Sequence, residues 1–320
     1  MKRQTKRILR EENSNGFILA LSFLTKIPVR TSLPASAPTS PPADSPASPS
    51  TGRLAGRLSG PAGADATGSG SRPGSCSSCE SGAAGETGEA GSFAVQLGRS
   101  AAWFPAVGAL IGCLLALVGF AASHVFSTMT CAVLVLIAQA GLTGGIHLDG
   151  FIDTADGLMS GRGRDRTLEI MRDSRVGAMG VIAAILLLTL KVALLAEMPR
   201  WLLYPSLFVM PAFGRWSMVY ALCLYPYARQ GPGLGKPFAD HVGGRELITA
   251  SVSAAILAVA AFGWVRGLLA GLGVFLATAA FAAGVARQIG GITGDTCGAT
   301  NEVVEVMTLA ILRAASQWLP

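Results

Sequence analysis

Long apolar segments alternate with short polar ones from Trp103 to the end of the chain. A helix that crosses a membrane needs about 20 predominantly apolar residues. By that criterion we expect seven spanning helices, at about 103–126, 128–146, 176–198, 201–224, 246–264, 267–286 and 303–319. The pattern therefore predicts an all-α fold, a polytopic integral membrane helical bundle, with residues 93–320 as the membrane-embedded domain.

The N-terminal part of the chain has a different character. Residues 1–30 start with a basic stretch and continue into a short apolar segment at 17–29, which Lys26 interrupts. This segment is too short to span, so we expect it to lie at the membrane interface, with a signal peptide as the alternative. Residues 31–92 are rich in Ser, Pro, Gly and Ala, which predicts a disordered insertion without chemistry.

Composition and charge support a membrane protein. Hydrophobic residues make up 51% of the chain and charged residues only 14%, whereas a soluble domain carries about 25% charge. The net charge is +6, and the Lys and Arg residues between the apolar segments cluster in alternate loops. The positive-inside rule therefore predicts that the N-terminus and the loops at 147–175, 225–245 and 287–302 are cytoplasmic. Since no groove-reading module is visible, we expect no nucleic-acid partner.

Three aspartates form the strongest chemical signal. Asp149, Asp153 and Asp156 recur at i, i+4 and i+7, a spacing that places them on one helical stripe about 60° wide. Carboxylates that close repel one another unless a cation joins them, and magnesium prefers carboxylate and phosphate oxygens. The apolar residues between them favour a metal site over the alternative, a solvated acidic loop. His147, just upstream, is either a general base or an interfacial residue.

Charged residues near or inside the predicted spans form a second group. Arg172, Asp173 and Arg175 abut the next spanning helix, where a charge needs a partner or a task. We expect these three to contact substrate or metal. The arginines within 162–166 are better explained as topology signals, although phosphate binding is the alternative. Arg215 lies in the middle of a span, which predicts that it faces a polar cavity.

A glycine-rich segment at 290–302 forms the third candidate. Its glycines, Gly294 among them, permit close backbone approach to a ligand. Asp295 lies on the same predicted membrane face as the aspartate stripe, so we expect it to join the metal site and to bind substrate. Glu302 and Glu305 either add oxygens to that site or form the acidic start of a helix.

At these residues the chain resembles the cobalamin synthase family, the adenosylcobinamide-GDP ribazoletransferases. Three blocks in this order carry the resemblance, namely GGIHLDGFIDTADGL, LEIMRDSRVGAMGV and GGITGDTCGATNEVVE. The resemblance covers about 15–30 and nearly everything from 93 to 320. The family generally lacks a counterpart of 31–92, which leaves the packing of the N-terminal segment as the open point.

The resemblance implies a catalytic domain at 93–320 that completes coenzyme B12. A hydroxyl of α-ribazole, or of its 5′-phosphate, attacks the cobinamide-linked phosphorus of adenosylcobinamide-GDP, and GMP leaves. The implied cofactor is Mg²⁺, held by Asp149, Asp153, Asp156 and Asp295, and the implied location is the bacterial inner membrane with a cytoplasmic active site. His147 or an aspartate would take the proton. A homo-oligomer is compatible with this sequence.

Two other functions fit parts of the pattern. CDP-alcohol phosphotransferases also use an aspartate stripe, but theirs typically carries an Ala-Arg pair after the first Asp-Gly, where this chain has Phe151-Ile152. Transporters usually bind coupling ions near the membrane midplane, whereas the acids here gather at one interface. Both alternatives are therefore less well supported than a phosphate-group transferase.

Overall fold

The computed structural model describes residues 16–27, 91–229 and 235–317. Regular secondary structure in these ranges is helical, and one isolated parallel bridge joins Tyr227 to Ile292. The predicted all-α bundle is confirmed. The basic start of the chain and nearly all of the predicted insertion at 31–92 lie outside the described residues.

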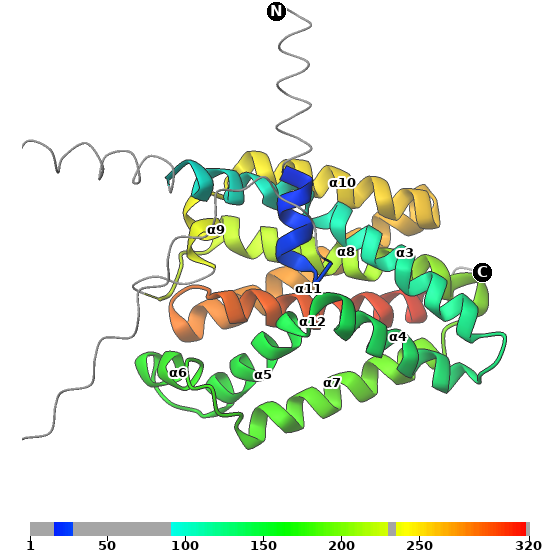
Figure 1. Ribbon diagram of the computed structural model, residues 1–320, viewed down its shortest axis with the longest axis horizontal. Helices are drawn as coiled ribbons and strands as arrows, with labels where there is room; N and C mark the ends of the chain where they lie inside the picture. The colour runs from blue at the N-terminus through cyan, green and yellow to red at the C-terminus, as the bar shows by residue number, and fades with distance from the viewer. Residues whose placement is uncertain (1–15, 28–90, 230–234, 318–320) are drawn as a thin grey trace, which may run out of the picture. The chain divides into compact units, whose positions relative to one another are not determined.

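The helices follow one another with short connections (Figure 1). The chain is helical at 16–24 and 91–100, and then forms η1 (Ala101–Trp103), α3 (Phe104–Ala122), α4 (Thr128–Thr143), α5 (Ile146–Met159), α6 (Arg164–Ile170), α7 (Ala178–Ala196), α8 (Arg200–Leu224), α9 (Lys236–His241), α10 (Gly244–Phe262), α11 (Trp264–Ile289) and α12 (Gly294–Ala315).

The spans differ from the seven predicted ones at three places. The first, predicted at about 103–126, is Gly91–Ala122. Within the described residues, five helices are long and apolar enough to cross a membrane, and α4 with α5 would make a sixth. The span predicted at 128–146 ends instead at Thr143, after which the chain turns by 95° into α5. The span predicted at 303–319 is part of α12, which begins at Gly294 and is not among these spans.

Helix α8 forms the centre of the bundle. In its most apolar stretch 83% of the residues are buried, against 17% in α10 and 22% in α7. It packs against α3, α10 and α12, and α12 in turn packs against α5, α7 and α11. Gly108 lets α3 approach α8 closely, since a Cβ there would lie 2.4 Å from the carbonyl oxygen of Pro211.

The N-terminal helix at 16–24 belongs to the same core, although a long segment separates it from α3 in sequence. Leu19, Ala20 and Leu24 are buried in that core. The rings of Phe17 and Trp103 meet edge to face with centroids 5.8 Å apart. The sequence did not determine how the N-terminal segment packs, and the structure shows that residues 16–27 pack against the core of the bundle.

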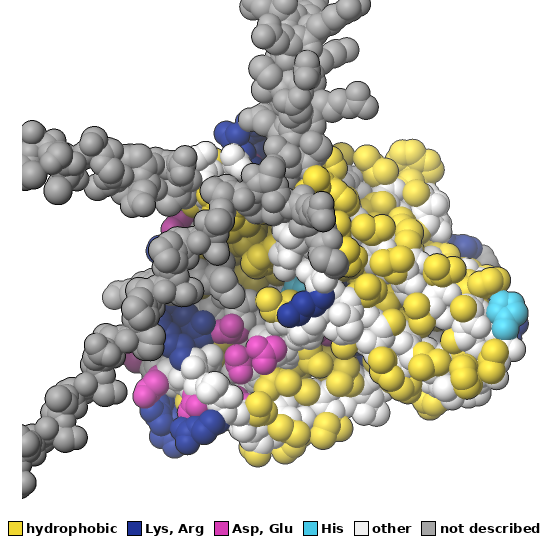
Figure 2. All heavy atoms as spheres, viewed as in Figure 1, with side chains coloured by type: hydrophobic (Ala, Val, Ile, Leu, Met, Phe, Trp, Pro, Cys, Tyr) yellow, Lys and Arg dark blue, Asp and Glu magenta, His cyan; other side chains and the backbone are white. Residues whose placement is uncertain are grey.

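The outer surface of the bundle is apolar, as lipid requires. Figure 2 shows hydrophobic side chains over most of one face, with acidic and basic side chains gathered toward one end. Large apolar side chains are exposed on several helices, among them Leu117 at 63%, Ile137 at 62%, Leu186 at 65% and Ile256 at 62%. The chain is thus a multi-pass membrane protein.

A buried charge network links four helices in the interior. Lys191 of α7 lies 2.6 Å from Glu302 and 2.7 Å from Glu305, both on α12. Arg215 of α8 also pairs with Glu305, and Gln139 of α4 donates a hydrogen bond to it at 2.5 Å. The two glutamates are therefore ion-pair partners inside the bundle. The idea that they add oxygens to the aspartate site is wrong, because α12 directs them at these cations.

The contact at Gly108 predicts a packing defect on substitution. Gly108→Ala would force a methyl group against the α8 backbone, which we expect to destabilise the protein by about 1–3 kcal/mol. Gly141→Ala is the matched control, since a Cβ there meets nothing within 4 Å. Thermal unfolding in detergent micelles measures both. Equal melting temperatures for the two variants would contradict the close α3–α8 contact.

The network predicts a larger effect for Lys191. Among the described residues, Lys191→Met leaves Glu302 without its ion-pair partner and Glu305 with Arg215 as its remaining one. Removal of one partner from a buried ion pair costs about 3–5 kcal/mol. Lys236→Met is the control, because Lys236 pairs with Asp240 on the surface with side chains 42% and 46% exposed. Such a pair contributes about 1 kcal/mol or less. Similar unfolding curves for both variants would refute the assignment.

Candidate functional site

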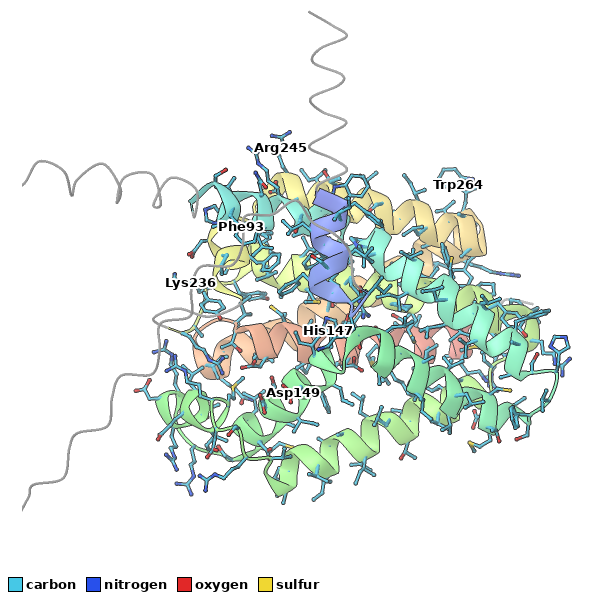
Figure 3. The ribbon with its side chains drawn as sticks, in the orientation of Figure 1. Phe93, His147, Asp149, Lys236, Arg245 and Trp264 are labelled. Carbon is cyan, nitrogen blue, oxygen red and sulfur yellow. The ribbon has the colours of Figure 1, made fainter. Side chains whose placement is uncertain are left out.

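The aspartate stripe begins just after the bend between α4 and α5. Gly144 and Gly145 adopt left-handed φ values of 66° and 70°, which side chains rarely tolerate. These two residues produce the 95° turn between the helices. Asp149, Asp153 and Asp156 then follow on α5, so the predicted helical stripe is confirmed as a helix. Figure 3 shows Asp149 and His147 near the start of this helix.

Helix α12 crosses α5 at two glycines. A Cβ at Gly150 would lie 2.8 Å from the carbonyl oxygen of Asp295, and one at Gly298 would lie 3.1 Å from that of His147. Thr293 caps the start of α12 by accepting a hydrogen bond from the backbone N–H of Thr296 at 3.2 Å. The glycines of both motifs thus bring Asp295 against the helix that carries the aspartates.

Arg229 is the cation that partly compensates these carboxylates. Its guanidinium lies 2.6 Å from a carboxylate oxygen of Asp295 and donates a hydrogen bond to the carbonyl oxygen of Met171 at 3.2 Å. Burial raises the pKa of Asp295, Arg229 acts in the opposite direction, and the nearby charge of Asp149 raises that pKa further. In the sequence, the signal at Arg229 is limited to its place in a basic loop.

The start of α6 is held near the same place. Arg164 donates hydrogen bonds to the carbonyl oxygens of Ile289 at 2.7 Å and Ala228 at 3.1 Å. The backbone N–H of Ala228 bonds the carbonyl of Ile292 at 2.7 Å. The loops at 147–175, 225–245 and 287–302 therefore meet at one end of the bundle, as the topology predicted.

Asp156 has a structural role that the sequence did not indicate. Its two carboxylate oxygens accept hydrogen bonds from the backbone N–H groups of Gly177 and Gly180, each at 2.7 Å. These are orphan donors at the start of α7, so Asp156 caps that helix and ties it to α5. To bind the predicted metal ion as well, Asp156 would have to use the same two oxygens that accept these hydrogen bonds.

The second predicted group lies in the loop before α7. Arg175 pairs with Asp173 at 2.6 Å, with side chains 87% and 39% exposed. The hydrogen bond from Arg175 lowers the pKa of Asp173 to about 2. Among the described residues, Arg172, Asp173 and Arg175 do not line the two cavities that contain Asp149. Their expected substrate contacts stay predictions.

Two cavities meet at Asp149. The first, which we call the aromatic cavity, has a volume of about 180 Å³ and is lined by Phe23, Phe104, Phe238, His147, Asp149, Gly294 and Asp295 among others. The second, the polar cavity, measures about 590 Å³ and is more open, with Lys26, Thr143, Gly145 and Asp149 in its wall. The structure thus brings four predicted site residues together: His147, Asp149, Gly294 and Asp295.

The carboxylates could hold a cation only together with other ligands. Within the described part of the chain, no three His, Cys, Asp or Glu side chains converge closely enough to hold a metal ion by themselves. Asp149, Asp153 and Asp295 nevertheless lie near enough for their charges to act on one another. Their oxygens are the donors that Mg²⁺ prefers, and Mg²⁺ usually keeps waters and takes substrate phosphates instead of a full protein cage.

Comparison with known proteins identifies the family. The family model for cobalamin-5-phosphate synthase matches residues 88–313. A protein of Roseiflexus sp. strain RS-1 is 42% identical over 215 residues, which cover 67% of this chain and 79% of the relative. A protein of Desulforamulus reducens is 40% identical over 225 residues, covering 69% and 88%.

A protein of Brevibacillus brevis is 40% identical over 227 residues, covering 69% of this chain and 89% of the relative. All three relatives carry the name adenosylcobinamide-GDP ribazoletransferase. No solved structure matches the chain. The matched region contains α3 to α11 and all but the last two residues of α12, and with them His147, Asp149, Gly294 and Asp295, so the chain is a transferase that belongs to the cobalamin-5-phosphate synthase family.

Proposed function

We propose that this protein is an adenosylcobinamide-GDP ribazoletransferase that catalyses the last step of cobalamin biosynthesis. It transfers the adenosylcobinamide phosphate group from adenosylcobinamide-GDP to α-ribazole or α-ribazole 5′-phosphate. The products are GMP and adenosylcobalamin or its 5′-phosphate. The observation that carries this proposal is the meeting of α5 and α12, which places Asp149 and Asp295 in one cavity wall in a chain about 40% identical to enzymes of that name.

The reaction replaces the phosphoanhydride bond within the donor's diphosphate by a phosphate ester bond to the acceptor. An acceptor hydroxyl oxygen forms a bond to the cobinamide-linked phosphorus, the bond from that phosphorus to the GMP oxygen breaks, and the hydroxyl proton passes to a base. Asp149 lines both cavities and is therefore placed to take that proton. His147 lines only the aromatic cavity and is the other candidate. Arg229, beside Asp295, is placed to orient phosphate oxygens.

Magnesium is the cofactor we propose. Asp149, Asp153 and Asp295 would hold it together with the diphosphate of the donor. When bound, Mg²⁺ neutralises charge on the diphosphate and on the departing GMP. Two observations support this proposal: three carboxylates lie close together, and Arg229 pairs with one of them, Asp295. Negative charge is therefore in excess, and a bound cation would remove that excess.

We further propose that the protein lies in the bacterial inner membrane with this site facing the cytoplasm. The support is the concentration of basic residues at the site end of the bundle, where Arg162, Arg164, Arg166 and Arg229 lie. Cytoplasmic loops of membrane proteins carry such an excess of Lys and Arg. Soluble corrinoid and nucleotide substrates would then reach the site without crossing the bilayer.

The proposed metal role of Asp153 predicts a loss of turnover on neutral replacement. Asp153→Asn should lower kcat by at least about 100-fold, since a catalytic metal contributes several kcal/mol of charge stabilisation. GMP release and formation of the corrinoid product measure the rate. Asp165→Asn is the control, because its side chain is 97% exposed. Near-normal turnover by the Asp153 variant, with intact membrane insertion, would remove that residue from the site.

Metal dependence gives a separate prediction. Excess chelator should abolish GMP release from the purified protein, and excess Mg²⁺ should restore it, while the size-exclusion profile stays unchanged. Without a cation the carboxylates would repel the diphosphate of the donor. Full turnover in chelator would exclude the metal mechanism but leave the transfer reaction itself standing.

A further inference from the structure

The aromatic cavity has a wall that the proposed chemistry does not use. Three phenylalanines from distant parts of the chain form it: Phe23 of the helix at 16–24, Phe104 of α3 and Phe238 of α9. Their ring centroids lie 4.6 Å apart for Phe23–Phe238, 5.6 Å for Phe104–Phe238 and 6.4 Å for Phe23–Phe104. Phe104 and Phe238 are buried and Phe23 is partly exposed, so the wall presents the ring of Phe23, with the other two rings behind it, to a planar aromatic ligand.

The size of the cavity limits what it can enclose. Cavities for drug-sized ligands measure about 300–1,000 Å³, whereas this one measures about 180 Å³. It therefore has room for a fragment of one or two fused rings and excludes a corrin macrocycle. Of the two proposed substrates, the acceptor offers a dimethylated benzimidazole base, and the donor offers guanine and the adenine of its adenosyl group.

The polar groups of the cavity favour the benzimidazole. His147 is only 4% exposed, and its Nδ1 has no hydrogen-bond partner among the described residues. A benzimidazole nucleoside has one free ring nitrogen, which accepts a single hydrogen bond, and its methylated ring is apolar. Guanine and adenine carry donors and acceptors around the edge of the ring system. Asp149 and Asp295 of the same wall can accept only from their N–H groups, so the polar atoms that face the phenylalanines would stay unpaired at a desolvation cost.

We propose that the aromatic cavity binds the base of the acceptor nucleoside, an inference that rests on the proposed function. The base lies against the three phenylalanines, and Nδ1 of His147 donates to its free ring nitrogen. Asp149 and Asp295 line the same cavity, so a base held there directs its ribose toward the carboxylates. This arrangement would position the attacking hydroxyl where Asp149 can take its proton.

Steady-state kinetics of the full-length protein in detergent micelles tests the proposal. Phe238→Leu removes a ring but keeps an apolar side chain, and Phe23→Leu does the same from another element. Both variants should raise the KM for α-ribazole about tenfold or more and leave the KM for adenosylcobinamide-GDP within about twofold. Phe120→Leu is the control, because Phe120 is 53% exposed and outside the cavity wall.

The outcomes separate this inference from the proposed function. Turnover by the unaltered protein tests the function alone. A raised KM for adenosylcobinamide-GDP, or no change for either substrate, in variants that unfold at the normal temperature would overturn the cavity assignment. Equilibrium dialysis of α-ribazole without donor gives a second measurement that needs no catalysis. Weaker binding by both phenylalanine variants than by Phe120→Leu supports the assignment, and equal binding refutes it.

Discussion

The pairing of charges inside a lipid-surrounded bundle is the constraint on which this structure depends. Lys191 and Arg215 are almost fully buried and face Glu302 and Glu305 of α12. Charges in such surroundings are stable only when they are paired, so α12 cannot slide or rotate without breaking these contacts. The network therefore fixes α12 against α7 and α8. Because α12 is fixed, Asp295 in its first turn stays against α5.

The site has the opposite electrostatic character. Asp149, Asp153 and Asp295 act on one another as like charges, and Arg229 compensates them only in part. Inside the bundle, the two cations Lys191 and Arg215 pair with two carboxylates. At the site, three carboxylates lie close to the single cation Arg229, which leaves an excess of negative charge. This imbalance is unfavourable in the free protein and becomes useful when a cation and a diphosphate are bound together.

Backbone proximity explains why the site motifs are rich in glycine. Gly150 and Gly298 allow α5 and α12 to cross at distances that a side chain would prevent, and Gly180 leaves room for the carboxylate of Asp156. The N-terminal helix contributes Phe23 and Lys26 to the cavity walls. This helix lies outside the region that the family model matches. It nevertheless packs in the same core as the matched helices.

The sequence by itself determined the membrane class, the helical stripe of aspartates and the meeting of three polar loops, because hydropathy and residue spacing are local properties. Only the tertiary structure decided which acids share the site. Glu302 and Glu305 turned inward to Lys191 and Arg215, and Asp156 turned to cap α7. Spacing along one helix gives the direction of a carboxylate but not its partner. The partner depends on how neighbouring helices cross, and that follows from packing across the whole bundle.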